Sequence, residues 1–287
     1  MNSSQKNTRF HYIAVVVMLF FVGCAEQVPK PAVSCSRKQS VTECLYYLQG
    51  YADSVKSFKA HGQCFAKFYV DGKLRKENFP VKLWFNPPFQ VRLQGDVAFN
   101  PRGVDLGSNE QTFWLAMKPK EVGNGYVWGQ WSQQKTFGEM PVHPEILLEA
   151  LGLIDVGAES DWSLTQQGDL DVLAERNEAG SIVKKIYVPR CDYRASRIEY
   201  FNTSGRTIVS AELEYKQAFR DISVPSVIKI LTCSEKGEES LFRITLASAN
   251  LYDFTEQRRK TFFTRYEPKG FEHVYRMING RLIKQPQ

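Results

Sequence analysis

The hydrophobic pattern begins with a short apolar run near the start of the chain. Residues 13–22 are apolar without interruption, and the polar stretch before them carries Lys6 and Arg9 but no acidic residue. A run of ten residues rises only about 15 Å as a helix, which is roughly half the hydrocarbon thickness of a bilayer. The pattern therefore predicts a cleaved signal peptide, residues 1–23, in place of a permanent membrane span.

The four residues that end this segment, Phe21-Val22-Gly23-Cys24, indicate a lipid anchor. They resemble the lipobox of bacterial lipoproteins, in which the cysteine is acylated and becomes the new N-terminus, although the first of the four stands where that motif usually has leucine. We expect lipidation at Cys24 and a tether over residues 24–39, which contain Pro29 and Pro31. Several acyl chains would hold the chain at a membrane, because each buried methylene contributes roughly 0.8 kcal/mol. An ordinary signal peptide with a chance cysteine is the alternative.

The pattern then takes a helical period and afterwards a period of two. Ser40 and Glu43 form a capping box at a helix start. The apolar residues that follow at spacings of three and four, and so share one helix face, are Val41, Leu45, Leu48, Ala52 and Val55. Alternation begins at Phe58 and continues to Val70, where Asp71-Gly72 supplies a hairpin turn. Two further strands repeat the alternation, so we expect an antiparallel meander of three long strands.

The rest of the chain adds shorter elements. His143-Pro144-Glu145 opens a brief helix with an apolar surface, and Gly152 ends it. Strands are predicted at about residues 112–117, 126–131, 169–176, 181–188, 194–201, 207–215, 224–233 and 240–249. The sequence thus predicts an α+β, mainly β fold, in which a curved antiparallel sheet (a half-barrel) wraps around the N-terminal helix and the short helix. This β domain is expected to span residues 40–253.

Several short motifs occur in the order found in one family of lipoprotein carriers. They are the segment Lys82–Phe89, the strand motif Asn109–Trp114, the helix Pro144–Gly152 and the segment Ser160–Trp162. On these residues the chain, over residues 40–217, resembles the LolA/LolB family of periplasmic lipoprotein carriers and outer-membrane lipoprotein receptors. Carriers of the family have an arginine just before a proline where this chain has Asn86, so the carrier's release mechanism is not carried over.

The resemblance implies a half-barrel whose concave face holds acyl chains in an apolar cavity, without catalysis and without a cofactor. The implied lipid-binding lining is the alternating apolar set of the first three strands, with three leucines of the short helix as a lid. These residues are Phe68, Val81, Leu83, Phe85, Val91, Leu93, Phe99, Leu147, Leu148 and Leu151. An ordinary packed core is the alternative, because alternation selects one face of the sheet but does not distinguish a filled core from a cavity.

The charge of the chain is concentrated at its C-terminal end. The formal net charge is +6, which falls to +4 once a signal peptide with Lys6 and Arg9 is removed. Residues 254–287 hold eight Lys and Arg against three Glu, and they extend beyond the family domain. We expect this basic C-terminal extension either to be solvated or to touch anionic lipid head groups or an acidic partner surface. The rest of the chain has no basic face, so nucleic acid is not expected as a partner.

Five cysteines follow the predicted lipidation site, and export would allow them to oxidise. Because five is odd, at least one must stay free or pair between chains. We expect one disulfide between Cys191 and Cys233, on neighbouring strands, and a second between two of Cys35, Cys44 and Cys64. The chain has no Cys-x-x-Cys pair and its histidines are scattered, so no metal site is predicted.

Enzymatic motifs are missing from the sequence. It contains no Gly-x-Ser-x-Gly elbow, Walker loop or His-Glu-x-x-His motif. Asp169 and Asp171 share a strand face, but we expect a solvated pair and not a general acid and base. Five tryptophans would suit a sugar-binding surface, although aromatic residues in a β domain are usually core. The prediction is a non-catalytic protein.

Together these features predict a membrane-anchored lipoprotein that binds lipid or lipoprotein acyl chains in envelope lipoprotein localisation or assembly. The alternative is a structural lipoprotein that holds an envelope protein complex together through an exposed sheet edge, without a lipid cavity. Ala25 follows the predicted anchor in place of the aspartate that resembles an inner-membrane retention signal. We therefore expect a lipid-anchored location at the outer membrane, facing the periplasm.

Overall fold

A helix and a long run of strands follow the order that the sequence predicts. The computed structural model describes residues 35–70, 72–97, 100–134, 140–216, 218–234 and 237–286. The predicted signal peptide, Cys24 and Phe99 lie outside these residues. Residues Ser36–Gln287 form one compact unit, which contains every described helix and strand. In this described part, no helix is long and apolar enough to cross a membrane.

The described residues contain three helices, and the first two begin where the sequence predicts them. They are α2 (Val41–Ser54), α3 (Pro144–Ala150) and α4 (Glu256–Phe263), with three short 3₁₀ turns, η1 (Lys120–Val122), η2 (Trp131–Gln133) and η3 (Glu159–Asp161). The Ser40 hydroxyl accepts a hydrogen bond from the Glu43 amide at 3.1 Å, and the Glu43 carboxylate accepts one from the Gln39 amide at 2.8 Å. Because free amides at a helix start need acceptors, this capping box fixes the first residue of α2.

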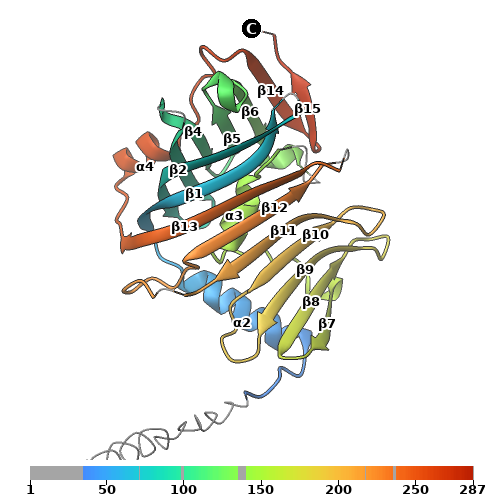
Figure 1. The fold of residues 1–287 in the computed structure, drawn as a ribbon. Helices are drawn as coiled ribbons and strands as arrows, with labels where there is room; N and C mark the ends of the chain where they lie inside the picture. Colours follow the sequence, from blue (N-terminus) through green and yellow to red (C-terminus); the bar gives the residue numbers. More distant parts are fainter. Residues whose placement is uncertain are drawn as a thin grey trace, which may run out of the picture. The chain divides into compact units, whose positions relative to one another are not determined.

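In the part of the chain that the structure describes, fifteen strands form a single sheet (Figure 1). They are β1 (Phe58–Val70), β2 (Lys73–Asn86), β3 (Gln90–Val97), β4 (Asn100–Ser108), β5 (Thr112–Met117), β6 (Gly125–Gln130), β7 (Trp162–Gln167), β8 (Leu170–Arg176), β9 (Ile182–Pro189), β10 (Arg197–Phe201), β11 (Thr207–Glu214), β12 (Val227–Cys233), β13 (Glu239–Leu251), β14 (His273–Ile278) and β15 (Arg281–Lys284). Their spatial order is β15-β14-β6-β5-β4-β3-β2-β1-β13-β12-β11-β10-β9-β8-β7. Neighbours are antiparallel except β14 and β6, which run parallel.

The sheet consists of two meanders that meet where β1 pairs with β13. This ladder runs from Phe58 opposite Leu251 to Lys67 opposite Leu241, so it joins the first strand to the thirteenth. Gly62 lies at a bulge in the ladder, where a Cβ atom would stand 2.1 Å from the carbonyl oxygen of Thr245. Only glycine fits there, because the backbones of the two strands approach too closely for any side chain.

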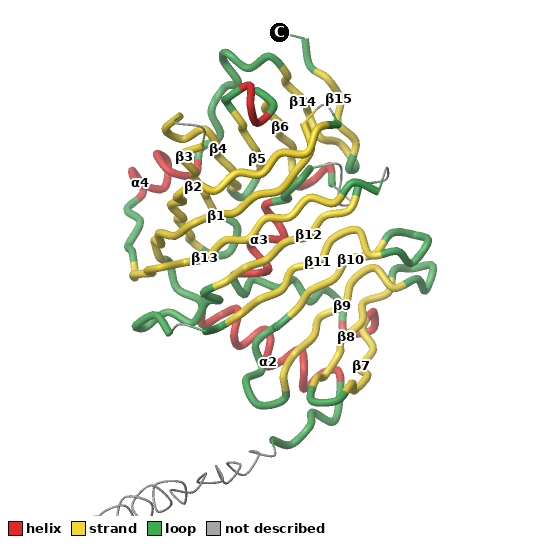
Figure 2. The backbone as a smooth tube through the Cα atoms, viewed as in Figure 1, coloured by secondary structure: helices red, strands yellow, loops and turns green. Residues whose placement is uncertain are grey.

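Alternation along the strands defines the two faces of the sheet. On β2 the buried residues Phe79, Val81, Leu83 and Phe85 alternate with more exposed ones. The sheet curves around α2 and α3, which lie on the same side of it (Figures 1 and 2). Helix α2 contacts β7, and α3 contacts β3, β4 and β11. The predicted mainly β fold, with a curved sheet around an N-terminal helix and a short helix, is confirmed.

The sequence did not predict β4 or β7, nor the elements of the C-terminal segment. Pro101, Gly103 and Gly107 interrupt the alternation of β4, and Gly107 is required because a Cβ atom there would lie 2.3 Å from the Trp114 ring. Residues 254–287, expected as a basic extension, supply α4, β14 and β15 and continue the sheet beyond β6. A parallel pair needs a crossover connection, and the segment that contains α4 leads to β14. The sheet is therefore mixed, where an antiparallel one was expected.

Cys191 and Cys233 do not form the predicted disulfide. Cys233 is a free thiol, whereas Cys191 is disulfide-bonded. The prediction fails for two reasons. First, β10 and β11 lie between β9 and β12 in the sheet. Second, Cys191 follows the end of β9, which lies at the edge of the sheet where β12 begins, whereas Cys233 is the last residue of β12. That separation exceeds the reach of a disulfide. Cys44 and Cys64 are buried free thiols, so the second predicted bridge is absent as well.

Candidate functional site: the apolar concave face

The predicted lipid-lining residues lie on the concave face of the sheet and are buried. Strand pairing places Leu83 opposite Leu93 and Phe85 opposite Val91. The nine residues of the set that the structure describes, each at most 6% exposed, are Phe68, Val81, Leu83, Phe85, Val91, Leu93, Leu147, Leu148 and Leu151. The six strand residues share one face of the sheet because they alternate along their strands, as the sequence predicts, whereas the three leucines belong to α3 and its C-cap.

A small apolar cavity lies in this core, with a volume of about 40 Å³. Of the predicted residues, Phe68, Leu93 and Leu147 line it, and the other six described residues are packed into the filled core around it. The further lining residues, all apolar, are Cys64, Ala66, Phe79, Val104, Leu106, Leu115, Met117, Val122, Val142, Phe242 and Ile244. The cavity therefore lies between α3 and six neighbouring strands of the sheet, which are β5, β4, β3, β2, β1 and β13.

One rim of the sheet marks the exposed end of the cavity. Val104, Met117 and Phe242 are only partly buried, whereas the other lining residues are buried. All three stand near the end of the sheet where β1 and β5 finish and where β4 and β13 begin. The rings of Phe68 and Phe242 stack there with centroids 6.0 Å apart and an interplanar angle of 14°. An apolar chain that entered the core would pass these rings.

The volume of the cavity sets what it can hold without rearrangement. A water molecule needs roughly 10–15 Å³ on this measure, and pockets for small organic ligands hold about 300–1,000 Å³. A cavity of about 40 Å³ has room for a few water-sized groups but not for an acyl chain. In this conformation the concave face is thus close to a filled core, and a lipid would fit only if side chains or α3 moved.

Sequence reasoning missed most of the cavity lining for two reasons. Cys64, Ala66 and Phe79 belong to the same alternating sets that supplied the predicted residues, and that signal could have found them. Phe242 and Ile244 alternate in the same way on β13, but no local pattern shows that β13 pairs with β1. The β4 residues were missed because that strand itself was not predicted.

A buried ion pair, which no motif in the sequence indicates, fixes α3 against the second meander. The Lys184 ammonium on β9 lies 2.5 Å from the Glu149 carboxylate on α3, with both side chains at most 6% exposed. Lys184 also donates to the Asp155 carbonyl at 3.3 Å, and the Tyr200 hydroxyl donates to Glu149. Burial would lower the pKa of Lys184, but the Glu149 carboxylate more than offsets this and raises it. Lys184 therefore stays charged and holds the inner side of α3.

The start of α3 carries two titratable groups that shift in opposite directions. The His143 Nδ1 accepts a hydrogen bond from the Glu145 amide at 3.3 Å, and its ring packs 4.7 Å from the Phe113 ring, centroid to centroid. Burial lowers the pKa of His143 to about 3, so the imidazole is neutral. Burial, and then the Glu149 carboxylate, raise the pKa of Glu145 to about 7. The Glu145 side chain is 44% exposed and that of His143 only 4%, so solvent weakens the contribution of the Glu145 pKa shift to stability more than that of the His143 shift.

Among the described residues, no group of three or more His, Cys, Asp or Glu side chains could hold a metal ion. Asp169 and Asp171, which the sequence places on one face of a strand, have different surroundings in the structure. The Asp169 side chain is 96% exposed and pairs with Arg190, whereas Asp171 is 1% exposed. The site on the concave face is an apolar one, and binding by exclusion of water is the chemistry that it offers.

Comparison with solved structures finds proteins of similar fold at low sequence identity. A putative outer membrane lipoprotein-sorting protein domain from Vibrio parahaemolyticus is 10% identical, with a TM-score of 0.50 over 77% of this chain and 97% of that chain. A LolA superfamily protein from Nitrosomonas europaea is 13% identical, with a TM-score of 0.48 over 77% of this chain and 97% of that chain. A DUF1329 family protein from Desulfovibrio piger is 12% identical, with a TM-score of 0.48 over 78% of this chain and 97% of that chain.

The sequence alone gives no such match, since no family model and no curated protein matches the chain. The likeness to the Vibrio domain is therefore a likeness of fold. In structure the chain is similar to a putative outer membrane lipoprotein-sorting protein domain and, at a lower TM-score, to a LolA superfamily protein.

Proposed function

We propose that the chain is a non-catalytic lipoprotein of the bacterial envelope that binds acyl chains of lipids or lipoproteins on its concave face. The observation that carries the proposal is the cavity beneath α3, whose lining residues are all apolar. Such a cavity has no polar partner for water, so it offers little to water and much to a hydrocarbon chain. The fold shared with a putative lipoprotein-sorting domain supports a role in lipoprotein sorting.

Acyl binding requires the cavity to widen, and the rim supplies side chains suited to that. Met117 is unbranched and adapts its shape easily, and Phe242 is only partly buried. The inner side of α3 is held by the Lys184–Glu149 ion pair, so we expect widening at the rim near Phe242 and not by release of the whole helix. Each apolar Å² that an acyl chain then removes from water contributes about 25 cal/mol.

Anchoring belongs to the same proposal. Lipidation of Cys24 after removal of residues 1–23 would hold the domain at the outer membrane, facing the periplasm, with residues 24–39 as the tether. A membrane-held protein of this kind would act as a receptor or chaperone at the membrane and not as a diffusing carrier. Two features support this part of the proposal: the lipobox-like residues, and Ala25, which stands after Cys24 where an inner-membrane retention signal would have aspartate.

A structural role in an envelope protein complex is the second candidate, and the small volume of the cavity favours it. Its contact surface would be a sheet edge. Strand β15 ends the sheet on one side and β7 on the other, and Ile283 on β15 is 46% exposed. An edge strand with unpaired amides and carbonyls can accept a strand of another protein.

A fatty-acid titration separates the two candidates. The test uses residues 35–287 and the fluorescent fatty acid cis-parinaric acid, with the variant Ala66→Leu, which fills the cavity from β1. The control is Ala211→Leu, which is also 0% exposed in the core but does not line the cavity. Acyl binding predicts saturable 1:1 binding that Ala66→Leu abolishes and Ala211→Leu keeps. If the wild type shows no saturable binding, or if both variants bind alike, the structural role is favoured.

A further inference from the structure

The outer face of the sheet carries a second, polar pocket under the C-terminal segment. It has a volume of about 340 Å³, within the range of small-molecule sites. Its lining comes from β3, β4, the residue after β5, and the end of α4 with the loop that follows. The lining residues are Arg92, Arg102, Asp105, Lys118, Thr261, Thr264 and Tyr266. Because Arg92 alternates with the core residues Val91 and Leu93, this pocket lies on the opposite face from the apolar cavity.

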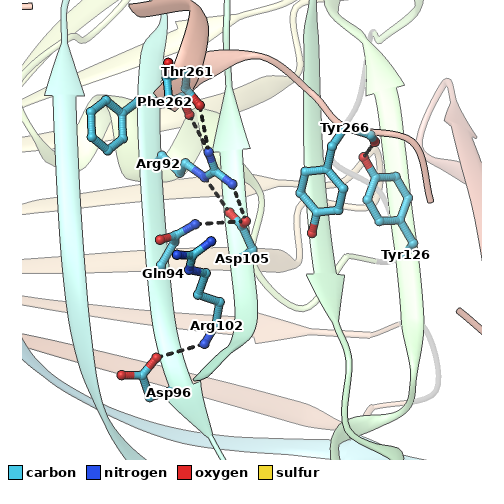
Figure 3. Close-up of polar contacts among 9 residues, drawn as sticks. All are labelled: Arg92, Gln94, Asp96, Arg102, Asp105, Tyr126, Thr261, Phe262 and Tyr266. Carbon is cyan, nitrogen blue, oxygen red and sulfur yellow. Dashed lines mark hydrogen bonds and ion pairs between the residues drawn. The ribbon is translucent and has the colours of Figure 1, made fainter. Parts of the chain in front are cut away.

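One cation of this pocket is fully used by the fold. The Arg92 Nε lies 3.0 Å from Oδ1 of Asp105 and its Nη2 lies 2.6 Å from Oδ2, and Nη1 donates to the Phe262 carbonyl at 2.9 Å (Figure 3). Gln94 adds a hydrogen bond to the same carboxylate at 3.2 Å. The Asp105 charge is thus neutralised, and Arg92 ties the C-terminal carbonyls of α4 to β3 and β4.

Two further cations have no such partner. Arg102 and Lys118 are exposed, and among the described residues no ion pair is formed by either side chain. Figure 3 shows the Arg102 side chain extending toward Gln94 and Asp105. The backbone of Arg102 is in the left-handed region, with φ of 54°, and its amide donates a hydrogen bond to the Asp96 carboxylate at 2.8 Å. Such a backbone is costly for a residue other than glycine, and it keeps a second positive charge at the pocket.

A buried hydroxyl completes the pocket. The Tyr266 hydroxyl is buried and has no hydrogen-bond partner among the described residues. The loop that carries it is fixed, because the Tyr126 hydroxyl donates to the Tyr266 carbonyl at 2.8 Å (Figure 3). An unpartnered buried hydroxyl destabilises a fold, and because Tyr266 lines the pocket, its hydroxyl indicates a missing acceptor there. Burial raises the pKa of Tyr266, so the group remains a donor.

We propose that this outer pocket binds an anion that carries a phosphate group. Arg102 and Lys118 supply the charge and the Tyr266 hydroxyl donates a hydrogen bond, while the Arg92–Asp105 pair forms the floor. A phosphate group offers several acceptor oxygens to a guanidinium, an ammonium and a hydroxyl at once. The pocket and the apolar cavity lie on opposite faces of the sheet, so this site stands or falls independently of acyl binding.

Calorimetric titration of the full-length protein in a phosphate-free detergent buffer tests the proposal. The titrants are inorganic phosphate and glycerophosphoglycerol, a soluble phosphodiester equivalent to a phospholipid head group. We expect saturable binding of at least one titrant, and about tenfold or more weaker binding in Arg102→Ala/Lys118→Ala, because two charged hydrogen bonds are lost. Binding of phosphate alone identifies a free phosphate or monoester as the ligand class, and binding of both identifies a lipid head group.

Two variants separate this site from general positive charge and from misfolding. Arg75→Ala/Lys76→Ala removes the same charge from exposed positions on β2 and should leave the affinity within about twofold of the wild type. Tyr266→Phe removes only the unpartnered hydroxyl, so it should bind phosphate several-fold more weakly without lowering the melting temperature. No saturable binding of either titrant, an equal loss in both double variants, or wild-type affinity in Tyr266→Phe would overturn the proposal.

Discussion

The buried ion pair between Lys184 and Glu149 allows a quantitative test of how α3 is held. Replacing Lys184 with methionine keeps the length of the side chain and removes its charge. Glu149, which is 3% exposed, then keeps only the Tyr200 hydroxyl as a donor. A carboxylate that is buried without its cation is unstable, and loss of one partner of such a pair typically costs about 3–5 kcal/mol.

The same magnitude follows from protonation. A carboxylic acid in this position escapes burial of its charge by taking up a proton, and each pH unit between an ordinary glutamate pKa near 4.3 and pH 7 costs about 1.4 kcal/mol. The total, about 4 kcal/mol, limits the loss that Lys184→Met can cause. In a chain of this size a loss of this order lowers the melting temperature by roughly 8–16 °C.

Urea unfolding of residues 35–287, followed by circular dichroism, measures the effect. We expect Lys184→Met to lose about 4 kcal/mol, and Lys184→Met/Glu149→Gln to recover most of it, because a glutamine oxygen still accepts from Tyr200 without a charge. Lys185→Met is the control, since Lys185 is the next residue on β9, is only partly buried and forms no ion pair among the described residues. A loss below about 1 kcal/mol in Lys184→Met, or no recovery in the double variant, would refute the reasoning.

Three further perturbations follow from the structure. The pKa of His143 is lowered to about 3, so its contribution to stability is present above pH 6.5 and lost as the pH falls, whereas the raised pKa of Glu145, about 7, gives a contribution lost as the pH rises from 4.5. In the wild type the two contributions offset each other. Glu145→Gln removes one of them and leaves that of His143, so the variant should unfold more easily in urea at pH 4.5 than at 6.5, and its free energy of unfolding should rise by up to about 1.4 kcal/mol per pH unit. A flat profile would contradict this. Arg92→Met leaves the 3%-exposed Asp105 without its cation and should cost about 3–5 kcal/mol in urea unfolding, whereas an unchanged midpoint would show that the pair does not hold α4. Ser40→Ala removes the cap of α2 and should cost about 1 kcal/mol, seen as a fall of about 2–4 °C in melting temperature, and Ser40→Asp should restore it.

Local signals were sufficient for the elements that face a core on one side only. The capping residues Ser40 and Glu43 set the start of α2, and strict alternation from Phe58 to Val70 set β1 with its bounds. Burial of one face forces a period of two on a strand, so β1 to β3 and their buried residues followed from the sequence. Where glycine replaces side chains that would clash, as at Gly107 under Trp114, the period is lost and β4 was missed.

Features that depend on distant pairing could not be predicted. The pairing of β1 with β13 placed Phe242 on the cavity, and the pairing of β14 with β6 drew the basic C-terminal segment into the sheet. The Cys191–Cys233 prediction failed for the same reason, because the order of strands decides which cysteines are near. The partner of Lys184 was equally hidden, since an isolated lysine in a strand is usually solvated.

Mass spectrometry of the native protein, with any lipid that co-purifies, tests the central proposal of acyl binding most directly. Residues 35–287, purified without detergent, should carry one fatty acid or phospholipid per chain, and the cavity-filling variant Ala66→Leu should carry none while Ala211→Leu retains it. A folded wild-type protein whose mass shows no lipid, before and after incubation with fatty acid, would contradict acyl binding and leave the structural role at a sheet edge as the better account.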